Sequence, residues 1–318
     1  MPALKLRIHN KENYMKKLVI LLLLTVVVLA QGNEKRIISI DSSGGTQTGN
    51  IRYGPIVFEH PDQEGIKAVV SNLEIFANKA ELRGPETEGE RLSLAEAKGQ
   101  RIAIFPNGVR IVRARLEAKG PVLSYNEATG LGVLTGGADI VVSPKDEASE
   151  AEPVLISTDQ VEFDVDTDIS ISKGNVSLVN GKQRAQADEL EYEEDRTLGV
   201  LSCEDSCTAT RLNDDGSVIT ITAQEIRVLT DTNLLYATGN VSVIDGNLIT
   251  SGDSVFFDDE KNIAEITGSP AVSVDSSEGV TVRGDRLLQD IEYDVVEVID
   301  ASVKSEFSKD AFVLTREQ

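Results

Sequence analysis

A single spacing of apolar residues recurs along most of the chain and constrains its fold more than any other feature. In residues 253–268, apolar side chains stand two, four, ten and thirteen positions after the start, and a glycine stands at position fifteen. The same spacing begins without gaps at Pro121, Asp159, Asp188, Gln224 and Asp285, and a copy two residues shorter begins at Ser71. Cys203 replaces the glycine in the copy at Asp188, and Gln289 and Asp300 depart from the pattern in the copy at Asp285. Seven copies of one spacing indicate a repeat architecture.

Each copy has the pattern of a β-hairpin. The apolar positions two and four alternate with polar ones, as in a strand with one buried face, and a turn rich in Asn, Asp, Gly and Lys follows. Linking strands such as residues 175–179 and 240–244 lead into Asn180-Gly181 and Asp245-Gly246, which are strong hairpin signals. One such unit cannot enclose its own apolar face, so the units must stack. The sequence predicts an all-β fold of stacked antiparallel hairpins, in one or two stacks.

The N-terminus has the pattern of a secretory signal peptide. Lys16 and Lys17 precede an apolar run over residues 18–29, and Ala30 provides a small residue at the cut. We therefore predict a signal peptide over residues 1–30, with translation starting at either Met1 or Met15, and an exported mature protein. An uncleaved inner-membrane anchor is the alternative.

Three regions follow the predicted signal. Residues 31–64 contain no clear copy of the spacing and are expected to cap one end, whereas residues 65–145 and 146–318 form a first and a second repeat region. The acidic stretch 143–153, which contains two prolines, interrupts the pattern. It is either a long loop or the boundary between two stacks.

The charge balance limits the functions that such a chain can have. Without residues 1–30 the chain carries 26 basic and 52 acidic residues, which argues against a nucleic-acid partner because phosphate binding needs a basic surface. Only His60 remains after the signal, and no phosphate-binding glycine loop or metal-ligand cluster is apparent. The acidic run 164–168 lacks the glycine of a calcium loop, since Ile169 stands in its place. We expect no enzyme, no cofactor and no metal.

The two cysteines, Cys203 and Cys207, allow three interpretations. In a straight strand, residues four apart lie about 13 Å from each other, too far for a disulfide. Cys203, however, occupies the glycine position of the repeat, where the other copies bend. A local disulfide, two free thiols, and a metal or redox role remain open.

Several runs resemble the OstA-type repeat. They are ATGNVSV at residues 237–243, TSGD at 250–253 with Val255 and Phe257, the turn at Asn262, and Gly268 before Pro270. This repeat belongs to a lipopolysaccharide-transport family that includes LptA, the periplasmic part of LptC and the N-terminal domain of LptD. The resemblance covers residues 65–304 and is strongest over 159–300. It implies a twisted, open-ended β-jellyroll in the periplasm that holds lipid acyl chains inside and bridges the two membranes.

Apolar residues on the predicted inward face are the candidates for a lipid groove, although the same residues would also fill a closed core. They are Val161, Phe163, Leu190, Tyr192, Val255, Phe257, Ile263, Val272, Val274, Val280 and Val282. The resemblance therefore predicts a lipid-binding bridge or transport protein for lipopolysaccharide or another acyl lipid. Its expected partners are other envelope transport components or a second copy, joined through the end strands. A structural or adhesive envelope solenoid without lipid is the alternative.

Overall fold

The computed structural model describes residues 34–85, 92–146 and 152–318, except residues 301, 304 and 306. The predicted signal peptide, residues 1–30, lies outside the described residues. Within the described part, no helix is both long and apolar enough to cross a membrane.

Twenty-one strands form one continuous sheet in which every pairing is antiparallel. The short strands are β1 (Ser39–Asp41), β2 (Thr46–Gly49), β3 (Ile56–Glu59), β4 (Ile66–Val70), β5 (Leu73–Ala77), β6 (Lys79–Arg83), β7 (Ile102–Phe105), β8 (Val109–Arg113), β9 (Leu116–Gly120), β10 (Val122–Asn126) and β21 (Val295–Val298). The long strands are β11 (Leu131–Val142), β12 (Val154–Asp164), β13 (Ile169–Asn180), β14 (Gln183–Glu193), β15 (Leu198–Leu212), β16 (Val218–Leu229), β17 (Leu234–Asp245), β18 (Leu248–Asp258), β19 (Ile263–Asp275) and β20 (Val280–Asp290). The prediction of an all-β fold of stacked antiparallel hairpins is confirmed.

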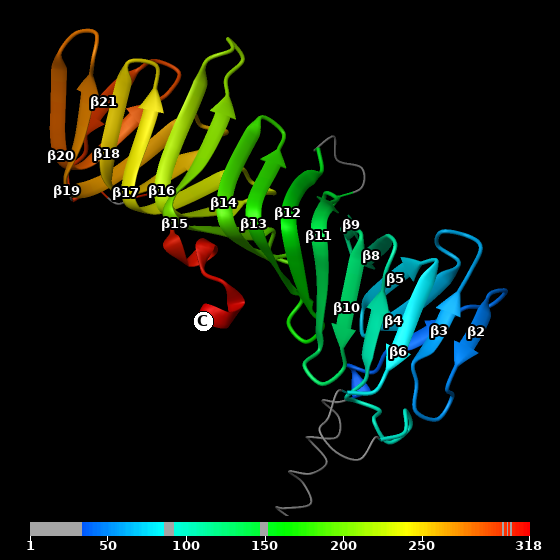
Figure 1. The fold of residues 1–318 in the computed structure, drawn as a ribbon. Helices are drawn as coiled ribbons and strands as arrows, with labels where there is room; N and C mark the ends of the chain where they lie inside the picture. Colours follow the sequence, from blue (N-terminus) through cyan, green and yellow to red (C-terminus); the bar gives the residue numbers. More distant parts are fainter. Residues whose placement is uncertain (1–33, 86–91, 147–151, 301, 304, 306) are drawn as a thin grey trace, which may run out of the picture.

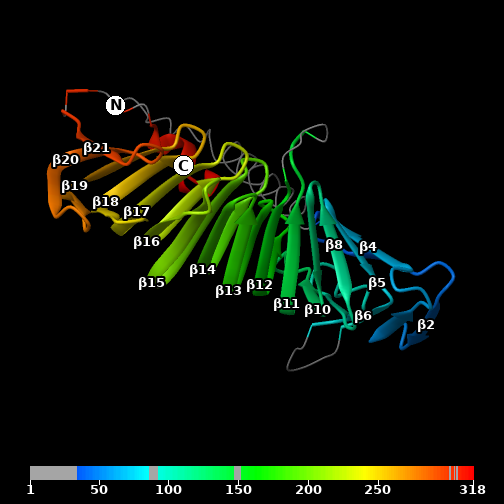
Figure 2. The same ribbon diagram turned by 90° about the horizontal axis from the view of Figure 1, so that it is seen from above.

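The sheet folds over into two layers (Figures 1 and 2). From β11 to β20, a shift of register in mid-strand divides each long strand into two halves, one in each layer. Layer A contains β2, β3, β6, β7, β10, β21 and the long-strand halves such as 160–164 and 234–238. Layer B contains β1, β4, β5, β8, β9 and the other halves, such as 154–158 and 241–245. Before β11, separate short strands build the two layers.

The bend between the layers explains the glycine of the repeat. Gly174 and Gly239 have φ of +78° and +82°, and the asparagines that follow them have φ of +47° and +52°. Glycine and asparagine adopt this left-handed conformation more readily than other residues do. The Gly-Asn pair therefore turns the strand from one layer into the other.

The sheet continues on both sides of the stretch 143–153, which was expected to be a loop or a boundary between two stacks. β11 and β12 pair along both layers, from Leu131 with Asp164 to Val142 with Val154. The stretch 143–153 therefore joins two neighbouring strands of one sheet, and the sheet does not break between residues 145 and 146. Residues 31–64 contribute β1, β2 and β3, and β1 and β2 are the first strands of layers B and A.

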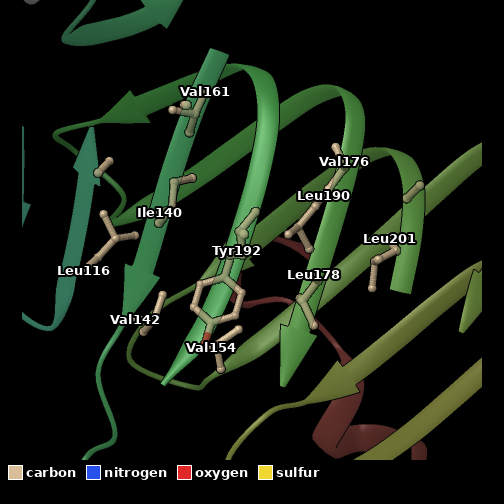
Figure 3. Close-up of a cluster of buried hydrophobic side chains, with 14 of the residues drawn as sticks. Leu116, Ile140, Val142, Val154, Val161, Val176, Leu178, Leu190, Tyr192 and Leu201 are labelled. Atoms are coloured by element: carbon tan, nitrogen blue, oxygen red, sulfur yellow. The ribbon is translucent and has the colours of Figure 1, made fainter. Parts of the chain in front are cut away.

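The largest hydrophobic core lies between the layers. It extends from Ile38 to Ile291 as one cluster, to which nearly every strand contributes. Figure 3 shows part of it, with Ile140 and Leu178 from layer B facing Leu190 and Leu201 from layer A. Stacking of the units thus buries the apolar face that no single hairpin can enclose.

The return strand of each hairpin differs from the expectation in one respect. Phe257 pairs with Ala264, so Ala264 and Ile266 face inward and Ile263 faces outward. Placing Ile263 in the groove was therefore wrong. Ile263 pairs with Asp258, the residue after the inward Phe257, and not with Phe257 itself. In a strand, a step of one residue exchanges the two faces.

Candidate functional site: the apolar interior and its mouth

Inward residues of layer A form a buried row at positions two and four of the repeat. Six of the sequence candidates belong to this row and are at most 3% exposed: Val161, Phe163, Leu190, Tyr192, Val255 and Phe257. Layer B faces them with a second row that includes Ile156, Leu178, Ile221 and Val243. The interior is thus a continuous apolar space, filled by the side chains of the protein itself.

The two valines Val272 and Val274 face away from this interior. Their neighbours Ala271 and Ser273 are buried, and the hydroxyl of Ser273 hydrogen-bonds that of Thr250 inside the protein. In β19 the bend spans residues 268–270, one residue more than the Gly-Asn bend of β17, and this extra residue reverses the inward face. The expectation of Val272 and Val274 as groove residues was therefore wrong.

The remaining candidates lie at the end of the stack. Val282 pairs with the inward Ser273 and packs against the core, while Val280 at the start of the same strand is 56% exposed. Among the described residues no later strand covers this part of β20, since β21 pairs with residues 287–290. The interior therefore opens at its C-terminal end.

The mouth of the fold is the side opposite the bends, where the hairpin turns of the two layers meet. Polar side chains join the layers along it. Asn180 of layer B donates its amide to the carbonyl of Thr230 (3.0 Å) and to Oδ1 of Asn233 (2.9 Å) in layer A. Lys145 pairs with Asp231 at 3.0 Å. These contacts hold the mouth closed at its centre.

Similar contacts continue in both directions along the mouth. Toward the C-terminal end, Arg211 of layer B pairs with Asp259 (2.5 Å) and donates to Oδ1 of Asn262 (2.6 Å) in layer A. Toward the N-terminal end, the Arg115 guanidinium donates to the Glu194 carbonyl at 2.7 Å, and Asn72 donates to Asp168 at 2.7 Å. We call these inter-layer contacts the mouth clasps.

A cavity of about 470 Å³ lies beside the central clasps, and Asn180, Lys145 and Asp231 help to line it. Its apolar wall comes from Val142, Val154 and Tyr192, and Tyr192 also belongs to the inward row. The rim carries three basic side chains, Arg115, Lys145 and Lys182, among several carboxylates. The cavity therefore combines apolar contact with the core and cationic groups at the surface.

A second cavity, of about 730 Å³, lies nearer the C-terminal end of the mouth and is acidic. Asp245 lines it and is only 8% exposed. Burial, followed by the nearby carboxylates of Asp294 and Asp215, raises the pKa of Asp245. The two cavities of the mouth thus differ in charge.

Cys203 and Cys207 are joined by a disulfide, with Cα atoms 5.4 Å apart. They flank the bend of β15, where register is lost between Ser202 and Cys207. This bend is two residues longer than the Gly-Asn bend of β17, so the disulfide closes the larger loop. The two interpretations with free or metal-bound thiols do not describe this structure.

Among the described residues, no group of three or more His, Cys, Asp or Glu side chains is placed to hold a metal ion. The acidic run 164–168 forms a hairpin turn, in which Asp166 pairs with Arg36 and Asp168 accepts from Asn72.

The repeat spacing predicts the inward row but not the mouth clasps. Asn180 was predicted only as a turn residue, and the alternation of the repeat gives no sign of Asn233, Arg211 or Asp259. Their partners are about 50 residues away in sequence, so the repeat spacing does not indicate them.

The fold and the candidate site together are an antiparallel sheet of consecutive hairpins, folded over an apolar interior. The model of the family of LptA and the LptD N-terminal domain, described as a lipopolysaccharide transport protein, matches residues 155–295. Residues 155–295, slightly less than half of the chain, therefore match the LptA and LptD N-terminal domain family.

One solved structure similar to this chain is that of LptH from Pseudomonas aeruginosa, the LptA-homologous periplasmic component of the lipopolysaccharide transport device. The two share 13% identity with a TM-score of 0.34, over 36% of this chain and 82% of LptH. No curated protein matches the chain.

Proposed function

We propose that this protein carries lipopolysaccharide or a similar acyl lipid through the periplasm, holding acyl chains between layers A and B. The observation that supports this proposal most directly is the continuous apolar interior of a segment that matches a lipopolysaccharide transport family. An apolar space of this length suits alkyl chains, which need contact area and few fixed polar partners.

Acyl chains can occupy this interior only if the layers separate. The mouth clasps are polar and lie at the protein surface, so water can replace them when they open. The central cavity is the natural entry, because its wall is continuous with the core through Tyr192 and its rim carries Arg115, Lys145 and Lys182. These cations would contact the anionic head group while the acyl chains pass inward.

The protein would act with other envelope transport components or with a second copy through its end strands. The first strands of the stack are β2 in layer A and β1 in layer B, and within the part of the chain that the structure describes each pairs on one edge. A strand added at either edge would extend the sheet and the apolar interior together.

Photo-crosslinking in cells tests the proposal. A photoreactive amino acid at Phe257 lies in the interior, and one at Val274 on the outward face serves as the matched control. We expect lipid adducts at position 257 and none at position 274. Equal labelling at both positions, or no lipid at 257 in a folded protein, would contradict the proposal.

A structural or adhesive solenoid without lipid is the second candidate, since the interior is filled by the protein's own side chains. It predicts that fluorescent acyl probes do not enter the purified protein. Saturable uptake of such a probe, competed by lipopolysaccharide, would exclude it.

A further inference from the structure

The C-terminal segment lies on the outside of layer A and adds no strand to the sheet (Figure 1). It contains two short 3-10 helices, η1 (Lys309–Phe312) and η2 (Thr315–Glu317). The segment leaves β21, passes Arg286 of β20, which donates to the carbonyl of Val303 at 2.7 Å, and runs back to β14. We call residues 307–318 the C-terminal strap.

Apolar side chains anchor the strap. Phe312 and Leu314 are 3% and 1% exposed, and they pack on the outward residues Leu198, Val200 and Phe256. The Phe256 ring lies 5.2 Å from that of Phe307 and 5.8 Å from that of Phe312, measured between centroids. This cluster is separate from the core between the layers.

Charged side chains of the sheet bind the backbone of the strap. Arg227 donates to the carbonyl of Phe312 at 2.7 Å and pairs with Glu317 at 2.7 Å. Arg196 donates to the carbonyl of Ala311 at 2.9 Å. Hydrogen bonds from arginine to backbone carbonyls recognise an extended segment whatever its side chains.

Two buried carboxylates complete the contact. Glu193 accepts from the backbone amide of Thr315 at 3.1 Å, and Glu191 forms an ion pair with Arg316. Glu191 is 4% exposed, and burial raises its pKa in spite of the nearby Arg316. The sheet therefore offers the strap both donors and acceptors.

The sheet beneath the strap is complete without it. Strands β14 to β18 pair with one another along layer A, and no strap residue takes part in these ladders. Without the strap, Val200, Tyr236 and Phe256 would form an exposed apolar patch of the kind that marks interaction surfaces.

We infer that the outward face of β14–β18 in layer A is a peptide-recognition surface for the C-terminal segment of this chain. Within one copy its own strap occupies the surface, and the strap of a second copy takes this place when the first is released. The contact is made by two apolar anchors of the strap and by two arginines and two carboxylates that face it. All of these groups lie outside the interior between the layers, so the inference does not depend on lipid binding. A tethered segment competes at an effective concentration of about 1 mM, so a free segment binds only where the resident strap has been weakened.

The test uses the full chain with Phe312→Ala and Leu314→Ala, which removes the strap's anchors but leaves the sheet intact. A fluorescent peptide with the sequence of residues 307–318 is titrated into this variant and into the wild type, and anisotropy is measured. We expect saturable binding to the variant in the micromolar range and at least about tenfold weaker binding to the wild type. A peptide carrying the same two alanines should not bind.

Two further changes test the surface itself. Adding Arg227→Ala to the variant should weaken peptide binding by about tenfold or more, because it removes a charged hydrogen bond. Adding Arg184→Ala, an exposed position on β14 in layer B, should leave binding unchanged. If the double alanine variant does not fold by circular dichroism, Arg316→Glu replaces it, since it sets a glutamate against Glu191. Absence of saturable binding to a folded variant, or equal binding to wild type and variant, would overturn the inference.

Discussion

Arg211 and Asp259 join the two layers at the mouth, with Nε of Arg211 2.5 Å from Oδ1 of Asp259. Arg211 lies near the end of the layer B half of β15, whereas Asp259 begins the turn after β18 in layer A. The same carboxylate accepts a hydrogen bond from Gln183 at 2.9 Å. One acidic side chain of layer A therefore holds two strands of layer B.

Replacing Arg211 by alanine should loosen the mouth. We expect Arg211→Ala to lower the free energy of unfolding by about 2 kcal/mol, because hydrogen bonds to charged groups at a largely buried site are lost. Urea unfolding followed by circular dichroism measures the change. Lys182→Ala is the control: its pair with Asp214 has side chains that are 57% and 92% exposed, so a change below about 0.5 kcal/mol is expected. Equal losses for both variants would show that Arg211 does not clasp the layers.

The buried carboxylate of Glu127 should make stability depend on pH. Burial alone would raise the pKa of Glu127, but hydrogen bonds from Arg101 and from the amides of Ile38 and Gly99 outweigh it and lower the pKa. A lowered folded-state pKa stabilises the fold above the unfolded pKa of about 4.3, and this stabilisation is lost as pH falls through the folded value.

Glu127→Gln should therefore cost about 3 kcal/mol at pH 7, since it leaves Arg101 without its buried partner, and the difference from wild type should shrink below pH 4. Chemical unfolding at pH 7 and pH 3.5 measures both values. Glu59→Gln, in the exposed pair with Lys79, should show neither effect. A difference that stays constant with pH would refute the role of the carboxylate charge.

The bend of β13 should not tolerate a side chain at Gly174. A Cβ atom there would lie 2.7 Å from Oδ2 of Asp159, which accepts a hydrogen bond from Asn175, and φ is +78°. We expect Gly174→Ala to cost about 2–3 kcal/mol, from left-handed strain and from crowding. Gly181→Ala at φ +57° has open space for the methyl group and should cost only the strain, about 1 kcal/mol. Melting temperatures of both variants decide whether crowding contributes.

The disulfide should stabilise the bend of β15. Reduction should lower the free energy of unfolding by about 2 kcal/mol, the chain-entropy value for so short a loop. Urea unfolding with and without a reductant measures the loss, and a Cys203→Ala, Cys207→Ala variant should be insensitive to reductant. No difference between oxidised and reduced wild type would show that the bend holds without the bond.

The repeat spacing was enough to predict hairpins, antiparallel stacking and the inward row at Val161, Phe163, Val255 and Phe257. These features follow from local rules, because alternation along a strand decides which side chains share a face. The same rules failed at Ile263, Val272 and Val274. There a single residue, gained or lost at a turn or bend, exchanged the two faces, and the spacing does not show where such a residue falls.

The sequence by itself therefore determined the β-repeat, its apolar interior and the turn at Asn180. Only the tertiary structure decided that Asn180 meets Asn233 across the mouth and that Phe312 and Leu314 cover Phe256 from outside. Contacts of this kind join residues about 50 or more positions apart and depend on how successive units twist against one another. Local alternation carries no information on that twist, because the twist results from the packing of all units together.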